Sequence, residues 1–380
     1  MSAMAEIELS GVTRRFKTGT ALDAVSLSVA EGETLALFGP SGAGKTVLLR
    51  LIAGVIEPDA GRIMLGGRDM ADVAPEERGV GMAFQNFALF PHMTAFDNIA
   101  APLTAQRKGA AALKAGVEAV ARLLKIDHVL DHAPRALSNG QKQRTALARA
   151  LAGAPKVLLL DDPLRNVDAK LRFEMRLELP RLLAAQGATT IYVTQDYKEA
   201  MALGHRIAVL EAGRIVQIGT PAEIYLAPAT LGIAQLFGDP AINLLEVTPE
   251  ADAHGPLARL SDMRAPLDPG LGHAVGRPCV LGLRPEAVRF ADADAPGAIP
   301  VTVEAETPLN EKVVSLTVTR RGREILVSRP AGAPGPAEGP AHIAIDAAHA
   351  LLFDRETGAR IAPRAPDAAQ RGPAKRGAAA

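Results

Sequence analysis

The first part of the chain alternates short apolar runs with longer segments of helical periodicity, which is the pattern of an α/β domain. The apolar runs that predict strands lie at 34–39, 156–161, 189–194 and 206–219. Two of these runs are continuously apolar, as strands buried on both faces of a sheet are. We therefore predict an α/β domain over residues 1–237.

The pattern changes at about residue 238 to short alternating strands between proline and glycine residues. The run at 301–306 alternates apolar and polar positions, and the run at 315–319 leads through an Arg-Gly turn to another at 323–328. We predict a small all-β module over residues 238–361, barrel-like or sandwich-like. Residues 362–380 hold too few large apolar groups to fold, so we predict a disordered tail there.

Composition narrows the class of protein. A length of 380 residues is more than one hydrophobic core usually organises. The 42 basic and 42 acidic side chains balance, which argues against a polybasic nucleic-acid binder. We find no apolar stretch of membrane-spanning length and no export signal, and expect a soluble chain. The single cysteine, Cys279, fits a reducing cytoplasm, and we interpret it as a small buried hydrophobe.

A glycine-rich segment, GPSGAGKT, follows the apolar run at 34–39 and precedes a helical pattern. It matches the phosphate-loop motif in the context that the motif requires. Its backbone N–H groups and the helix start are expected to bind phosphate oxygens, Lys45 to bridge the β- and γ-phosphates, and Thr46 to ligate Mg²⁺. The alternative is a glycine-rich turn that binds nothing. The predicted ATP-binding residues here are Gly39, Pro40, Ser41, Gly42, Ala43, Gly44, Lys45 and Thr46.

Four further motifs follow in order: FQNFALFPHMT, LSNGQKQRTALARAL, VLLLDDPLRNVDAKLR and IYVTQDYKEAM. Together with the phosphate loop they closely resemble the ATP-binding subunits of ABC transporters. Segments 282–288 and 351–358 resemble the C-terminal accessory (TOBE-like) domain of sugar and glycerol-phosphate importer ATPases. The resemblance spans about residues 6–361. It implies a P-loop NTPase (ABC ATPase) α/β domain with a helical subdomain, followed by a small all-β OB-like domain that helps the subunits dimerise.

The resemblance also implies roles for residues around the bound nucleotide. Phe16 is similar to the aromatic side chain that stacks on adenine, although a core phenylalanine is almost as good an interpretation. Gln85 resembles the glutamine that contacts Mg²⁺ and the attacking water. Asp161 closes an apolar strand, the expected place for a carboxylate that holds Mg²⁺ through water.

Other implied roles concern a second subunit. The segment LSNGQ resembles the signature that caps the γ-phosphate held by the opposite subunit, and its residues are Ser138, Asn139, Gly140 and Gln141. Serine is a good N-cap and a helix start attracts anions, which agrees with that role. Asp168 looks like the residue that communicates across the dimer, with a plain helix-capping role as the alternative.

Two catalytic positions depart from the family pattern. Asp162 stands where the family has a glutamate that polarises the attacking water, and Gln195 stands where it has a switch histidine. The carboxylate of Asp162 is one methylene short, and a glutamine cannot carry the charge of an imidazolium. Lesser changes are Val47, Asn139 and Arg165. The alternative interpretation is drift that leaves hydrolysis adequate.

From these changes we hypothesise a weakened site and a heterodimer with a second, different ATP-binding subunit. The leading function is the ATPase of a carbohydrate or polyol-phosphate importer, peripheral to the cytoplasmic face of the membrane, with ATP and Mg²⁺ as cofactors. Its expected partners are two permease subunits and an extracytoplasmic solute-binding protein, and no nucleic acid. Alternatives are a mainly nonhydrolytic nucleotide-gated subunit and a soluble non-transport ABC ATPase. The sequence does not identify the solute.

Overall fold

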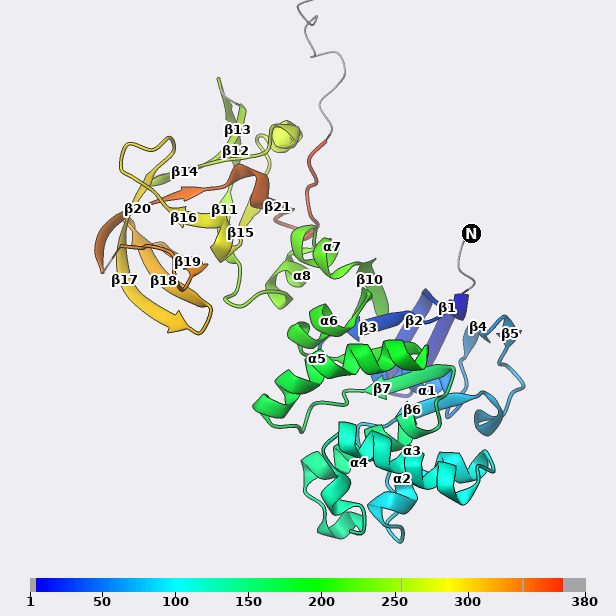
Figure 1. Cartoon of the computed structure of the whole chain (residues 1–380). Helices are drawn as coiled ribbons and strands as arrows, with labels where there is room; N and C mark the ends of the chain where they lie inside the picture. Colours follow the sequence, from blue (N-terminus) through cyan, green and yellow to red (C-terminus); the bar gives the residue numbers. More distant parts are fainter. Residues whose placement is uncertain (1–4, 254, 337, 365–380) are drawn as a thin grey trace, which may run out of the picture. The chain divides into compact units, whose positions relative to one another are not determined.

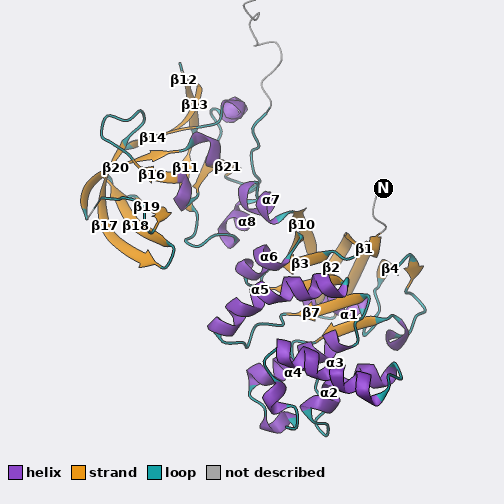
Figure 2. Ribbon diagram, in the orientation of Figure 1, coloured by secondary structure: helices purple, strands orange, loops and turns teal. Residues whose placement is uncertain are grey.

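The computed structural model describes residues 5–253, 255–336 and 338–364, and the chain divides into two compact units, 1–222 and 223–380 (Figure 1). Helices gather in the first unit and strands make up most of the second (Figure 2). The part of the chain that the structure describes has no helix long and apolar enough to cross a bilayer. Most of the predicted tail, 365–380, lies outside the described residues.

The first unit contains two sheets. A four-stranded antiparallel sheet has the order β2-β1-β4-β5, with bounds Gly19–Ala30, Ala5–Phe16, Ala60–Leu65 and Arg68–Asp69. A six-stranded sheet has the order β10-β9-β3-β8-β7-β6, with bounds Arg214–Gly219, Arg206–Glu211, Thr34–Phe38, Thr189–Thr194, Val157–Asp161 and Val80–Ala83. Its strands run parallel from β9 to β6, and only β10 is antiparallel.

The helices of the first unit include α1, which follows β3, and α2, α3 and α4, which lie together as a helical layer (Figure 1). The α-helices are α1 (Lys45–Ile52), α2 (Ala95–Ala105), α3 (Ala110–Leu123), α4 (Asn139–Ala152), α5 (Ala169–Gln186) and α6 (Tyr197–Leu203), with α7 (Pro221–Leu226) at the division. Short 3₁₀ turns are η1 (Pro75–Glu77), η2 (Asp127–Val129) and η3 (Pro134–Ala136).

The predicted strands at 34–39, 156–161 and 189–194 are confirmed as β3, β7 and β8, and the continuous apolar runs are explained by burial on both faces. Along β7, Leu158 and Leu160 join one core with the helical layer, whereas Val157 and Leu159 join another with α1 and the antiparallel sheet. The run at 206–219 forms two strands, because a turn with positive φ at Ala212 and Gly213 reverses the chain.

The second unit is all-β apart from short helices. Its sheets have the orders β11-β15-β21, β12-β13-β14 and β16-β20-β17-β18-β19. The strands are β11 (Asn243–Val247), β12 (Pro249–Asp252), β13 (Gly255–Leu260), β14 (Met263–Pro266), β15 (Cys279–Leu283), β16 (Val288–Phe290), β17 (Ile299–Leu309), β18 (Lys312–Thr319), β19 (Glu324–Pro330), β20 (Gly339–Ile345) and β21 (Ala350–Asp354). The other elements are α8 (Leu231–Leu236), η4 (Pro269–Ala274), η5 (Pro285–Ala287) and η6 (Ala347–His349).

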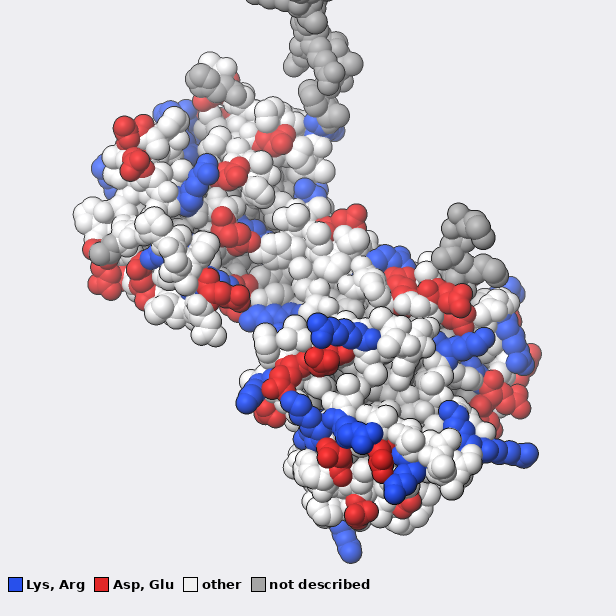
Figure 3. All heavy atoms as spheres, viewed as in Figure 1, with Lys and Arg blue, Asp and Glu red and all other residues white. Residues whose placement is uncertain are grey.

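The second unit begins earlier than residue 238, the start that the sequence pattern predicts, because α8 packs on its strands. Ala234 of α8 shares a small core with Leu351 and Phe353 of β21. Cys279 is fully buried in β15, as interpreted, and burial raises the pKa of its thiol. On the face shown in Figure 3, acidic and basic side chains are interspersed on both units, which agrees with the balanced composition.

Candidate functional site

The phosphate loop connects β3 to α1, and its glycines are needed where the backbone is crowded. A Cβ atom at Gly39 would lie 2.2 Å from the carbonyl oxygen of Leu210. Gly44 has φ of 105°, and a Cβ there would lie 2.4 Å from the carbonyl oxygen of Ala21. Side chains at either position would displace the backbone, so the loop conformation depends on glycine.

Lys45 begins α1 and is almost fully buried. Its ammonium donates to the carbonyl oxygens of Gly39 and Pro40, both at 2.7 Å. Burial lowers the pKa of Lys45, and the nearby carboxylates of Asp162 and Asp161 oppose this. An ammonium has three donors, so one remains for a phosphate oxygen.

Strand order brings the distant motifs to one pocket. Because β3, β8 and β7 are adjacent and parallel, the phosphate loop, Gln195 and the two aspartates all follow strand ends at the same edge of the sheet. The resulting pocket has a volume of about 250 Å³. Its lining residues are Ala21, Ser41, Gly42, Ala43, Gly44, Lys45, Thr46, Val47, Gln85, Asp161, Asp162, Arg165, Val193 and Gln195.

The oxygen atoms at one side of this pocket suit Mg²⁺. Thr46 Oγ1 donates to Asp161 Oδ1 at 3.2 Å, and Gln85 lines the same pocket. Burial raises the pKa of Asp161, while the hydrogen bond from Thr46 and the charges of Arg50 and Lys45 lower it. The described residues contain no cluster of three or more His, Cys, Asp or Glu side chains able to hold a metal. Mg²⁺ beside a nucleotide does not need one, since one or two carboxylates, water and phosphates complete its shell.

Asp162 occupies the other side of the pocket in an unusual backbone conformation. Its φ is 50°, in the left-handed region, and its N–H donates to the carbonyl oxygen of Val193 at 3.0 Å. Arg165 Nη1 lies 3.9 Å from Asp162 Oδ2. Burial raises the pKa of Asp162, and Arg165 opposes this most strongly. Gln195 and Gln85 are exposed side chains in the same pocket.

Phe16 does not line this pocket. Its side chain is 43% exposed and Arg14 lies over its ring, 5.0 Å from the centroid. The interpretation of Phe16 as a core residue is therefore wrong, because the end of the β1–β2 hairpin holds it outside the core. Its stacking on adenine stays a prediction.

The signature residues form the start of α4, away from the pocket of their own chain. Ser138 is the N-cap, and it forms a capping box with Gln141. Ser138 and Asn139 are exposed and Gly140 is half-buried, so the surface at this helix start is accessible. The described structure is compatible with the expected contact to a partner's nucleotide, which stays a prediction.

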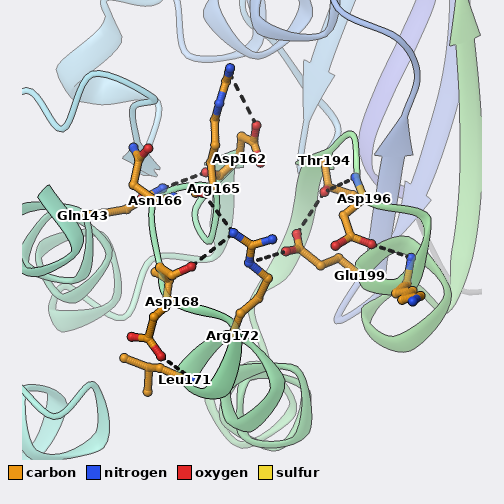
Figure 4. Close-up of polar contacts among 12 residues, drawn as sticks. Gln143, Asp162, Arg165, Asn166, Asp168, Leu171, Arg172, Thr194, Asp196 and Glu199 are labelled. Atoms are coloured by element: carbon orange, nitrogen blue, oxygen red, sulfur yellow. Dashed lines mark hydrogen bonds and ion pairs between the residues drawn. The ribbon is translucent and has the colours of Figure 1, made fainter. Parts of the chain in front are cut away.

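Asp168 caps α5, because its side chain accepts a hydrogen bond from the N–H of Leu171 at 3.0 Å (Figure 4). The capping alternative is therefore confirmed, and communication across a dimer stays a prediction.

Figure 4 also shows polar residues that sequence reasoning missed. Gln143 joins α4 to the loop after β7, and Arg172 of α5 lies 4.0 Å from Glu199 of α6. Glu199 is 2% exposed and accepts hydrogen bonds from Tyr192 and Thr194. Glu199 follows the polar segment 195–198, so its sequence context does not signal its burial.

The chain matches one family model and is similar in sequence to known importer proteins. Residues 22–165 match the family model described as ABC transporter. The chain is 40% identical to the sn-glycerol-3-phosphate import ATP-binding protein UgpC of Cereibacter sphaeroides, over 94% of this chain and 100% of the relative. It is 39% identical to UgpC of Escherichia coli K12, over 94% and 100%. It is 41% identical to the trehalose/maltose import ATP-binding protein MalK of Thermococcus litoralis, over 83% and 89%.

Among solved structures, the chain resembles the dimeric ATP-binding cassette MJ0796 in a post-hydrolysis state with ADP and phosphate. The TM-score is 0.53 and the identity 30%, over 57% of this chain and 98% of the other. Fold, phosphate loop and relatives together define an ABC ATPase, and the predicted fold class is confirmed. The chain belongs to the ABC transporter family, in the group of importer ATP-binding subunits.

Proposed function

We propose that this chain hydrolyses ATP to drive an importer for a carbohydrate or polyol phosphate. The observation that carries the proposal is the single pocket shared by the phosphate loop, Asp161, Asp162 and Gln195. The solute class is supported by relatives named for import of glycerol 3-phosphate and of trehalose or maltose. The chain works at the cytoplasmic face of the membrane, with two permease subunits and an extracytoplasmic solute-binding protein.

The residues of the pocket divide the work of hydrolysis. Lys45 and the backbone N–H groups of the loop bind the phosphates. Thr46, Asp161 and Gln85 would hold Mg²⁺, which neutralises charge that develops on the phosphate oxygens. Asp162 orients the attacking water and accepts its proton, and Gln195 donates a hydrogen bond to a γ-phosphate oxygen.

This arrangement predicts slow turnover. The side chain of aspartate is one methylene shorter than that of glutamate, so the carboxylate of Asp162 lies roughly 1 Å or more short of where that of a glutamate would lie. Such a displacement can lower the rate of hydrolysis about 10²-fold. Gln195 supplies a neutral donor in place of a charged one. We therefore infer that the chain pairs with a second, different ATP-binding subunit, which provides the faster site.

The test is steady-state ATP hydrolysis by the purified chain, with Mg²⁺. We expect a low rate for the wild type and at least a 10-fold rise on combining Asp162→Glu with Gln195→His. Lys45→Ala is the control and should abolish nucleotide binding. ATP binding without turnover, in the wild type and in the double variant alike, would favour a nonhydrolytic subunit. Fast hydrolysis by the wild type would refute the weakened site and remove the reason for a heterodimer.

A separate experiment addresses the solute. Cells that express the chain with candidate permeases and a solute-binding protein are supplied with labelled glycerol 3-phosphate or labelled maltose. Uptake that depends on Lys45 is expected for one of these classes. Uptake that is equal with wild type and Lys45→Ala would contradict the transport role.

A further inference from the structure

Gln143 is a buried amide that connects two segments of the ATPase unit. It lies in the second turn of α4 and is 4% exposed. Its Nε2 donates to the carbonyl oxygen of Asp162 at 2.8 Å, and its Oε1 accepts from the N–H of Asn166 at 2.8 Å (Figure 4). One side chain thus holds both ends of the loop 162–166.

This loop needs to be held because Asp162 has a positive φ of 50°. A non-glycine residue in the left-handed region costs on the order of 1 kcal/mol, and it keeps that conformation only where its surroundings enforce it. The N–H of Asp162 is fixed to β8 through Val193. Its carbonyl is fixed to α4 through Gln143. These two bonds set the peptide planes on either side of the Cα atom, and hence the direction of the carboxylate.

An amide suits this position because the loop presents one acceptor and one donor to it. A glutamate would meet the Asp162 carbonyl with an oxygen, and a methionine would satisfy neither group, although it is similar in size. Buried polar groups left without partners cost about 1–3 kcal/mol each, so the loop would rearrange to reach water. The identity of residue 143 therefore controls the loop conformation.

The start of the same helix, one turn before Gln143, carries the signature residues. Ser138 and Gln141 form the capping box at its start, and the helix continues without interruption to Gln143. A displacement of the start of α4 moves Gln143 with it, because a helix of this length behaves as a rigid element. The buried side chain of Gln143 thus joins the signature segment to the catalytic loop of the same chain.

We propose that Gln143 is a positioning residue that holds Asp162 in its hydrolytic orientation and couples it to the signature segment of the same chain. The proposal rests on the proposed function, since it assumes that Asp162 acts on ATP. Through Gln143, binding of the partner's nucleotide against Ser138 changes the rate of ATP hydrolysis in the chain's own pocket, while the residues that bind phosphate there stay in place.

The test compares Gln143→Met with a matched control, Thr145→Val, in the full-length chain. Thr145 is a fully buried polar residue of the same helix, but its hydroxyl donates only to Gln141 within the helix. We expect Gln143→Met to lower kcat at least 10-fold and to leave ATP affinity within about twofold. In the chain mixed with its partner ATP-binding subunit, the same substitution should reduce the Hill coefficient for ATP toward 1. Thr145→Val should leave all three near wild type.

The outcomes separate the two proposals. If the wild type is too slow to measure, the same variants are compared in the Asp162→Glu, Gln195→His background. Loss of ATP affinity in parallel with kcat, or equal effects of the two substitutions, would show an ordinary packing role and overturn the inference. So would an unchanged kcat in Gln143→Met. Failure of both wild type and background to bind and hydrolyse ATP would instead overturn the proposed function.

Discussion

Arg284 offers a test of how the second unit holds its helices. Its guanidinium is 4% exposed and donates to the carbonyl oxygens of Tyr225, Ala234 and Phe237. It also lies 3.9 Å from the centroid of the Tyr225 ring. The three carbonyls lie at the C-terminal ends of α7 and α8, where a positive charge is favourable. Replacement by methionine keeps the apolar stem and removes the charged head.

The size of the effect follows from these contacts. Hydrogen bonds from a charged donor contribute about 1.5–3 kcal/mol each, and their losses are not additive, since a loosened helix end reaches water. Breaking one side of a buried charged network costs about 3–5 kcal/mol. For a unit of this size, 1 kcal/mol corresponds to roughly 3–4 °C in Tm. We therefore expect Arg284→Met to lower the unfolding temperature of the second unit by about 10–20 °C.

The assay is calorimetric unfolding of the full chain with and without ATP. A nucleotide stabilises the unit that binds it. The unfolding transition whose temperature does not change when ATP is added therefore belongs to the second unit. Arg277→Met is the matched control, because Arg277 is half-exposed and forms a surface ion pair with Asp354 at 2.9 Å. Such pairs contribute about 0–1 kcal/mol. A shift for Arg284→Met no larger than for Arg277→Met would refute the reasoning.

Three further predictions concern the ATPase unit. Asn98 is fully buried and forms hydrogen bonds with the backbone of Phe90, Met93 and Thr94. Asn98→Ala should therefore lower the free energy of unfolding, measured by urea titration, by about 2–4 kcal/mol. A loss below about 1 kcal/mol would contradict this. Asp168→Ala removes the cap of α5 and should cost about 1 kcal/mol by the same measurement, whereas Asp168→Asn should cost less. Burial raises the pKa of Glu199, so the stability that the protonated side chain contributes is present below the ordinary carboxyl pKa and is lost as pH rises through the raised pKa. Over that range, the free energy of unfolding of Glu199→Gln should fall less than that of the wild type. Equal slopes of the free energy of unfolding against pH would refute this.

Sequence reasoning succeeded where the chemistry is local. The phosphate loop is eight consecutive residues between a strand and a helix, and both neighbours have clear patterns. Asp161 was recognisable because it ends a continuous apolar run. The parallel strand order that brings Asp162 and Gln195 to the same pocket was not predicted, and only the structure shows it.

It failed where a side chain acts across a long sequence separation. Gln143 bonds to residues of the loop after β7, and Arg284 bonds to helices about 50 residues earlier. Gln143 has the sequence context of an ordinary surface amide, and Arg284 follows the apolar run at 279–283 with no signal in the sequence that its guanidinium reaches two helices. Arg165 was noted as a departure from the family pattern, but its place in the pocket depends on the turn that Asp162 makes.

The position of β3 has a consequence for synthesis of the protein. This strand carries the phosphate loop, all its residues are buried, and its two neighbours are β8 and β9. About 150 residues separate its end at Phe38 from the start of β8 at Thr189. At 5–20 residues per second a ribosome needs roughly 10–30 s to produce them. Throughout that interval both edges of an apolar strand lack their native partners, so the growing chain depends on chaperones or on temporary collapse until the part of the ATPase unit from Thr189 onward emerges.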